Sequence, residues 1–323
     1  MLATRLTARF GLRYPILNAP MALIAGGALA GAVTRAGGLG LIGGGYAGTL
    51  GAEPELAQEY AAARGARIGI GFITWALHQA PQALDAALAL NPVCMFLSFT
   101  DPAPFATRVA QAGVPLFCQA QTLRHVAEAV AAGAQAVVVQ GTEAGGHGGA
   151  RGLMSLLPEA ADYLAQHAPE TLLLGAGGIA DGRGLAAALL LGADGVVVGT
   201  RLWAATEALT PEPMVTRAIA ATGDATVRTR ALDALRGVDW PAEFSFRVMR
   251  NALTEAWDGR EAAAELARGS LRDTWREARQ RGDLEVIPPV AGEAIGLIAA
   301  REPAAALISR MGDDAARLLT NAR

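Results

Sequence analysis

The sequence contains no lysine, so all 27 of its basic residues are arginines. Lysine forms Schiff bases with carbonyl substrates and reaches the nucleotide phosphates in a P-loop, so both kinds of site are excluded. A lysine general base is excluded for the same reason. The absence is typical of a GC-rich coding bias, which the abundance of alanine and glycine supports.

Cysteine, excess charge and long apolar segments are also scarce. Cys94 and Cys118 lie in apolar runs without C-x-x-C spacing, which predicts buried free thiols in a reducing compartment. The net charge of −3 argues against nucleic acid or an anionic membrane as a partner. The first ten residues lack the apolar core of a signal peptide, and Asn18 and Pro20 interrupt the nearly uncharged stretch 15–34. We therefore expect no membrane span and a cytoplasmic location.

Short apolar runs alternate with helix-like segments over the first two thirds of the chain. The runs are continuous rather than alternating in hydrophobicity, as in parallel strands that are buried on both faces. The expected strands are 14–21, 39–42, 67–73, 93–98, 114–119, 136–140, 172–175 and 195–199. The expected helices between them are 28–36, 54–64, 81–90, 104–112, 123–132, 155–167 and 182–191. Repeated strand–helix units of this kind predict an α/β protein with a (β/α)8 TIM barrel.

The composition changes after Thr206. A Pro-containing break at Thr210–Pro213 precedes charged amphipathic helices and three of the five tryptophans, namely Trp240, Trp257 and Trp275. We interpret residues 207–285 as a mainly helical insertion or cap that serves as a substrate domain. Residues 1–206 and 286–323 would form the barrel, with final helices at 292–299 and 303–319 packing back onto it.

A glycine-rich stretch, Gln140–Gly149, follows the sixth expected strand and contains one imidazole, His147. Glycines on both sides let the backbone approach a ligand closely, which a buried structural histidine does not require. We interpret His147 as an acid/base group beside a flat cofactor, and the alternative is a surface histidine in a flexible loop. Glu143 either orients the imidazole or points away into a salt bridge.

The ends of the seventh and eighth expected strands carry the features of a phosphate site. Loops at these places in TIM barrels hold phosphates through backbone N–H groups, and Gly177, Gly178, Gly199 and Thr200 occupy them. Arg201 either adds charge there or forms a structural ion pair. Gly175–Ala180 matches the dinucleotide pattern G-x-G-x-x-A, but no acidic residue ends the next strand, so a mononucleotide phosphate is favoured. The spacing of His78, His125 and His167 predicts no metal site.

Four motifs occur in an order that resembles the nitronate monooxygenase family. They are Asn18-Ala-Pro-Met21, Ala36-Gly-Gly-Leu-Gly40, Gln140-Gly-Thr-Glu-Ala-Gly-Gly-His147, and Gly177-Gly-Ile-Ala-Asp-Gly-Arg-Gly184 together with Gly199-Thr200-Arg201. The resemblance implies FMN at the strand ends and His147 as the catalytic residue near the flavin. The implied cofactor-binding residues are Ala19, Pro20, Met21, Gly71, Gln119, Gln140, Gly145, Gly146, Gly177, Gly178, Gly199 and Thr200. Many family members have an asparagine near the end of the third strand, where this chain has Gly-Ile-Gly71-Phe-Ile.

The resemblance implies an FMN-dependent monooxygenase that oxidises nitronates or nitroalkanes with O2 to carbonyl compounds and nitrite. His147, neutral and with a pKa near 7, would remove the α-proton or steer the nitronate, and Met21, Leu23, Ile24 and Phe72 would line a small pocket. NAD(P)H-dependent FMN reductases acting on quinones or enoyl-acyl-carrier proteins share these motifs and form the alternative. A barrel without flavin, either a phosphate-ester isomerase or a binding protein, is a third alternative. A homodimer is compatible with the sequence.

Overall fold

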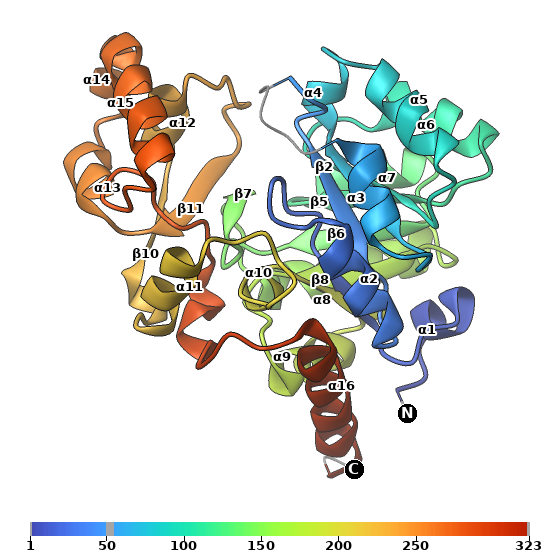
Figure 1. Ribbon diagram of the computed structural model, residues 1–323. Coiled ribbons are helices and arrows are strands. Elements are labelled where there is room, and N and C mark those ends of the chain that lie inside the picture. Colours follow the sequence, from blue (N-terminus) through green and yellow to red (C-terminus); the bar gives the residue numbers. More distant parts are fainter. Residues whose placement is uncertain (1, 50–54, 322–323) are drawn as a thin grey trace.

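A parallel sheet of eight strands forms the centre of the molecule in this computed structural model, which describes residues 2–49 and 55–321 (Figure 1). The strand order is β1-β9-β8-β6-β5-β4-β3-β2. The strands are β1 (Ile16–Asn18), β2 (Leu41–Gly45), β3 (Gly69–Ile73), β4 (Met95–Ser98), β5 (Leu116–Ala120), β6 (Ala136–Gln140), β8 (Leu172–Ala176) and β9 (Gly195–Val198). Each of the eight expected strands is therefore found, β6 with the expected bounds and the others with one or both ends shifted by up to a few residues.

A buried asparagine joins the two ends of this sheet. The first and last strands in the order meet through a bridge between Leu17 and Leu39. Next to it, the Asn18 amide donates to the Leu41 carbonyl and accepts from the Leu41 N–H, both at 2.8 Å. These bonds satisfy a polar side chain with no exposed surface. The sheet is thereby closed into the predicted TIM barrel.

Helices cover the outer face of the barrel, and apolar side chains fill its interior. The inner cluster includes Leu17, Leu41, Phe96, Phe117 and Val138, while alternate strand residues pack outward against the helices. The helices of this part of the chain are α1 (Arg5–Phe10), which packs through Leu6 against the inner cluster, α2 (Gly27–Arg35), α3 (Leu56–Ala62), α4 (Thr74–Leu77), α5 (Gln82–Ala89), α6 (Ala103–Gln111), α7 (Leu123–Ala131), α8 (Leu153–His167), α9 (Gly182–Leu190) and α10 (Thr200–Trp203). The expected helix over 54–64 begins at Leu56, and position 54 lies outside the described residues.

The region 207–285 contains strands as well as the expected helices. Its elements are α11 (Glu212–Ile219), η1 (Gly223–Ala225), β10 (Thr226–Thr229), α12 (Ala231–Arg236), β11 (Ser245–Met249), α13 (Ala252–Trp257), α14 (Glu261–Leu266) and α15 (Arg268–Arg281). Each of the two strands contains one arginine, Arg228 in β10 and Arg247 in β11, and nearly all of their residues are buried. In Figure 1, α12 to α15 and β11 lie to one side of the barrel.

A second, antiparallel sheet connects the region 207–285 to the barrel. β11 pairs with β10 on one side and with β7 (Gly146–Gly148) on the other. Since β7 is part of the glycine-rich stretch after β6, the hairpin of this region forms hydrogen bonds directly with the loop that carries His147. The sequence predicts a cap but not this shared sheet.

The C-terminal segment returns to the barrel as predicted. The expected helix over 292–299 is a short 3-10 helix, η2 (Glu293–Leu297), and the last helix is α16 (Ala304–Asn321), which packs against α9 and α2. Cys94 and Cys118 are buried free thiols, and burial raises the pKa of both. Within the described residues, no helix combines the length and apolar character needed to cross a bilayer.

Candidate active site

His147 is the middle residue of β7 and lies directly opposite Phe246 of β11. Its side chain is 5% exposed, so the alternative of a surface histidine in a flexible loop is wrong. Gly148, next to His147, allows a close approach of the Gln140 and Arg228 side chains. A Cβ at Gly148 would lie 2.9 Å from the Gln140 Oε1 atom. The ring is therefore a fixed, buried group within a small sheet.

Three side chains from the region 207–285 surround the imidazole. Its Nε2 atom lies 2.9 and 3.0 Å from the two carboxylate oxygens of Asp233. Trp240 stacks on the imidazole at a ring-centroid distance of 3.4 Å and an interplanar angle of 6°. Phe246 stacks on the same imidazole at 4.3 Å and 7°. The Nδ1 atom makes no hydrogen bond with any described residue. One ring nitrogen is thus held and the other is left for a ligand.

The surroundings of His147 lower its basicity. Burial lowers the pKa of His147 from 6.5 to about 4, and Asp233 opposes this shift by hydrogen bond and charge. The cationic side chains of Arg236 and Arg228 lower the pKa further. The expected pKa near 7 is therefore wrong, because the sequence shows neither the burial of the ring nor the two arginines beside it. The imidazole is neutral at physiological pH.

Two arginines of the β10–β11 hairpin hold the glycine-rich loop. Arg228 Nη2 donates to the carbonyl oxygens of Thr142 and Ala144, each at 2.9 Å, and Arg247 Nε donates to Thr142 at 3.0 Å. Arg228 Nη1 also donates to the Ser245 carbonyl at 2.6 Å. Burial lowers the pKa of Arg228 to about 10. The loop that carries His147 is therefore tied to the hairpin through its carbonyl groups.

Glu143 takes neither of its two expected roles. Its carboxylate oxygens accept from the Leu153 N–H at 3.0 and 3.2 Å, at the first residue of α8. A negative charge at a helix N-terminus is stabilised by the unpaired N–H groups there. Asp233, 86 positions further along the chain than His147, contacts the imidazole instead.

The ends of β8 and β9 present a cradle of free backbone N–H groups where the sequence predicts a phosphate site. Gly177 and Gly178 adopt φ values of 104° and 71°, which only glycine adopts without strain. The backbone N–H groups of these two residues, and those of Gly199 and Thr200, have no hydrogen-bond acceptor among the described residues. Thr200 Oγ1 accepts from the Gly292 N–H at 2.9 Å, which leaves its own O–H to donate. Four accessible donors of this kind suit a phosphate group.

Arg201 does not face this cradle. Its guanidinium is buried and forms an ion pair with Glu302. Burial lowers the pKa of Arg201, while the Glu302 carboxylate opposes the shift. Of the two interpretations of Arg201, the structural ion pair is confirmed.

The remaining expected contacts differ in how accessible they are. Ala19, Pro20 and Met21 are half-buried at the end of β1, as is Gln119 of β5. Gly146 has a φ of 80°, and a Cβ there would lie in ordinary contact with Val290, at 3.9 Å from its Cγ1 atom. None of these positions is fully buried.

Two of the glycines that were expected to contact the cofactor, Gly71 and Gly145, lie against other segments of this protein. A Cβ at Gly71 would lie 2.5 Å from Pro20, and a Cβ at Gly145 would lie 2.5 Å from the backbone of Ala291. These glycines are required by the close approach of another chain segment. Their contribution to a ligand site is therefore to let Pro20 and the segment at Ala291 come near.

Gln140 connects the strand ends to the histidine loop. Its Nε2 atom donates to the His147 carbonyl at 3.2 Å, and its Oε1 atom accepts from Gln121 Nε2 at 3.1 Å. Gln121 Oε1 is buried and has no partner. This chain of amides ends in an acceptor that a ligand donor can satisfy.

Further buried polar atoms without partners lie after neighbouring strands. They are Thr74 Oγ1 and Trp75 Nε1 after β3, and Thr100 Oγ1 after β4. Native proteins seldom leave such atoms unsatisfied, so the group points to a polar ligand at this rim. Phe99 and Thr100 also adopt left-handed φ values of 66° and 63°. Strain of this kind is common at functional sites. No motif in the sequence marks these residues, and their places just after strands are the signal that could have found them.

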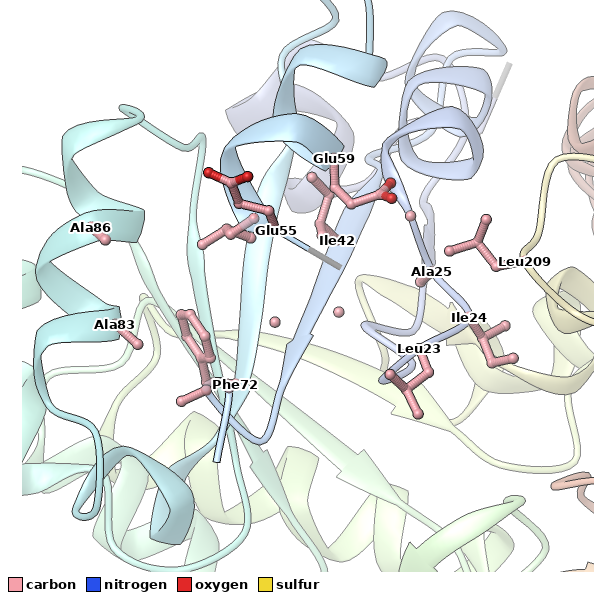
Figure 2. A pocket seen from close by; sticks show the side chains of 16 residues that line it. Leu23, Ile24, Ala25, Ile42, Glu55, Glu59, Phe72, Ala83, Ala86 and Leu209 are labelled. Atoms are coloured by element: carbon pink, nitrogen blue, oxygen red, sulfur yellow. The ribbon is translucent and has the colours of Figure 1, made fainter. Parts of the chain in front are cut away.

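The residues expected to line a small pocket border a cavity beside the barrel (Figure 2). Its volume is about 410 Å³, and Leu23, Ile24 and Phe72 line it, whereas Met21 does not. Figure 2 shows Phe72 across the cavity from Leu23 and Ile24, with residues of α3 and α5 nearby. Phe72 points outward because alternate residues of β3 face opposite sides of the sheet. His147 and the cradle glycines are not among its lining residues.

Comparison with known proteins identifies the family to which this chain belongs. A family model described as nitronate monooxygenase matches residues 81–314. The nitronate monooxygenase of Neurospora crassa is 33% identical and covers 93% of this chain and 88% of its own length. FabK from Thermotoga maritima has a TM-score of 0.84 at 25% identity, covering 100% of this chain and 99% of that chain. The nitroalkane oxidase from Streptomyces ansochromogenes has a TM-score of 0.75 at 27% identity, covering 97% and 98%. The chain therefore belongs to the nitronate monooxygenase family, whose members are flavin-dependent oxidoreductases.

Proposed function

We propose that this protein is an FMN-dependent nitronate monooxygenase that converts nitronates and O2 to carbonyl compounds and nitrite. The observation that carries the proposal is the free Nδ1 atom of His147, held in a buried ring after β6, the strand next to β8 in the barrel. Family membership supports the flavin and the reaction class. We further propose that residues 207–285 form the unit that completes the substrate site.

The residues present fit FMN rather than a larger dinucleotide. The free N–H groups at the ends of β8 and β9, together with the Thr200 hydroxyl, would hold a single phosphate. The unpartnered Thr74, Thr100 and Gln121 atoms would satisfy the polar atoms of a flavin ring. Thr74 directly follows the end of β3, near the place where many relatives have an asparagine. When bound, FMN supplies the redox chemistry by accepting electrons from the substrate and transferring them to O2.

His147 would act as the proton acceptor of the site. A neutral imidazole with a bare Nδ1 can take the α-proton of a nitroalkane, and Asp233 would then stabilise the buried imidazolium. With a pKa of about 4, however, His147 is a weak base. A nitronate has already lost this proton, so the low basicity favours nitronates over neutral nitroalkanes as substrates.

A visible spectrum of the purified protein, followed by anaerobic mixing, tests the proposal. We expect flavin absorption bands that bleach with nitronate alone and recover on admission of O2, with release of nitrite. Rapid bleaching by NADH or NADPH, with no response to nitronate, would overturn the proposal in favour of the FMN reductase. A colourless protein that binds no added FMN would exclude both flavin functions.

A further inference from the structure

We propose that Asp233 is the positioning residue that holds His147 in one tautomer, with hydrogen on Nε2 and the lone pair on Nδ1. The inference rests on the proposed function only for the acid/base role of His147. It makes the region 207–285 a contributor to the chemistry as well as a cover for the barrel.

The contact between the two side chains determines where the proton lies. Both carboxylate oxygens of Asp233 are within 3.0 Å of the His147 Nε2 atom. An ionised carboxylate can only accept hydrogen bonds, so Nε2 must be the donor. In a neutral imidazole the other nitrogen then carries the lone pair. Nδ1 is therefore the basic atom.

Stacking fixes the plane of the same ring. Trp240 and Phe246 lie nearly parallel to it, at centroid distances of 3.4 and 4.3 Å. A flip of the imidazole about its Cβ–Cγ bond would have to pass through one of these neighbours. The stacking therefore holds the orientation of the ring, while Asp233 determines its protonation pattern.

Asp233 is itself oriented by its own helix. It lies on α12, where Arg236 follows one turn later and its Nη1 atom is 3.5 Å from Asp233 Oδ1. Arg236 Nη2 donates to the Tyr46 hydroxyl at 3.3 Å, and Trp240 Nε1 donates to the same oxygen at 3.2 Å. Tyr46 follows β2, so this network ties α12 to the barrel.

The charged groups that act on the imidazole come from two elements. Asp233 and Arg236 lie on α12, and Arg228 lies on β10. The two arginines disfavour protonation of the imidazole, and Asp233 favours it. Replacement of Asp233 by asparagine removes the only one of these groups that raises the pKa of His147. It also introduces an amide N–H that can donate to Nε2, which allows the opposite tautomer.

Nitrogen NMR of the ¹⁵N-histidine-labelled holoenzyme tests the tautomer without measuring activity. The chain has four histidines, and a His147→Gln variant assigns the signals of His147. We expect a protonated Nε2 and a bare Nδ1 between about pH 5.5 and pH 8. In Asp233→Asn we expect the Nδ1–H form to become populated. A protonated Nδ1 in the native enzyme, or an unchanged tautomer in Asp233→Asn, would overturn the proposal.

Kinetics with a nitroalkane and with its preformed nitronate test the consequence. For Asp233→Asn we expect kcat for the nitroalkane to fall by roughly 10²-fold with little change in KM, and a smaller loss with the nitronate. Asp233→Glu, which keeps the carboxylate, should restore part of the rate and the native tautomer. Equal losses with both substrates, or the same loss in Asp233→Glu as in Asp233→Asn, would count against the proposal.

A matched control and a folding check separate the possible failures. Asp239→Asn changes an exposed carboxylate that pairs with Arg268 in the same region, and it should behave as the native enzyme does. Near-UV circular dichroism and the flavin spectrum establish that each variant is folded and loaded. If Asp233→Asn does not fold, Asp233→Glu and the native-enzyme NMR still decide the question. A protein that oxidises neither substrate but shows the expected tautomers would refute the proposed function and leave the role of Asp233 standing.

Discussion

The barrel and the region 207–285 contribute different kinds of groups to the same site. The ends of β8 and β9 offer backbone N–H groups on glycines, whereas the insertion offers the side chains of Asp233, Trp240 and Phe246. Backbone donors suit a ligand with many acceptor oxygens, such as a phosphate. Side chains suit the control of one reactive group. In the proposed function, the barrel would bind the cofactor and the insertion would control His147.

The largest effect should come from replacing His147, which the barrel loop carries and the region 207–285 surrounds. We expect His147→Gln to lower kcat/KM for a nitroalkane by about 10³-fold, because the proton acceptor is lost. The loss with preformed nitronate should be much smaller, since that substrate needs no deprotonation. Steady-state oxygen consumption with each substrate measures both. His167→Gln, which changes an exposed histidine of α8, is the control. Equal losses with the two substrates would exclude the base role.

The second largest effect should be a loss of stability when the hydrogen bonds from Arg228 to the glycine-rich loop are removed. Arg228→Gln removes the donors to the Thr142, Ala144 and Ser245 carbonyls, so we expect a loss of about 3 kcal/mol in the free energy of unfolding. Urea denaturation measures it. Arg230→Gln, at an exposed arginine of the same segment, should change stability by less than about 0.5 kcal/mol. Similar values for both variants would show that the loop does not depend on Arg228.

A change in the barrel should weaken cofactor binding without reaching His147. Gly177→Ala forces a side chain into a φ of 104° with its Cβ 3.0 Å from the Gly141 carbonyl oxygen. We expect FMN affinity to fall by about tenfold, as strain of 1–3 kcal/mol is typical at such positions. Gly133→Ala is strained in the same way, at a φ of 79°, but has open space and lies before β6. Titration of apoprotein with FMN should show a loss only for Gly177→Ala. Equal affinities would remove the cradle from the binding site.

The smallest effect expected is that of pH near neutrality. Because burial lowers the pKa of His147 to about 4, kcat/KM for a nitroalkane should vary by less than about twofold between pH 6 and pH 8, after correction for substrate ionisation. Activity should fall only as pH approaches about 4. Stability should decline over the window from 6.5 to about 4, since the unfolded chain binds this proton first. An inflection near 6.5 that disappears in His147→Gln would contradict the effect of burial.

The barrel could be predicted because its signals are local. Each strand is a continuous apolar run that ends at a glycine or a polar residue, and the fold places such ends together. The cradle at Gly177, Gly178, Gly199 and Thr200 follows from the same rule. Arg201 illustrates its limit, since the sequence could not distinguish a phosphate contact from the ion pair that it forms with Glu302.

The contribution of the insertion could not be predicted because its signals are distant. Asp233 lies in a six-residue helix with an ordinary amphipathic pattern, and nothing near it in the sequence refers to His147. The pairing of β7 with β11 depends on three residues of a glycine-rich loop, which has no strand propensity of its own. Burial of the imidazole, and hence its low pKa, follows from this pairing. Sequence patterns therefore selected His147 but could not predict its environment.

The pairing of Phe246 with His147 has a consequence for how the protein acquires its activity. The active imidazole is one member of a ladder whose side chains alternate between two faces, so a shift of one residue would present a glycine in its place. The ladder joins segments about a hundred residues apart, and contacts of such length are slow to form during folding. Competence for chemistry therefore depends on a second pairing event besides barrel closure, the pairing of the hairpin with β7 in register.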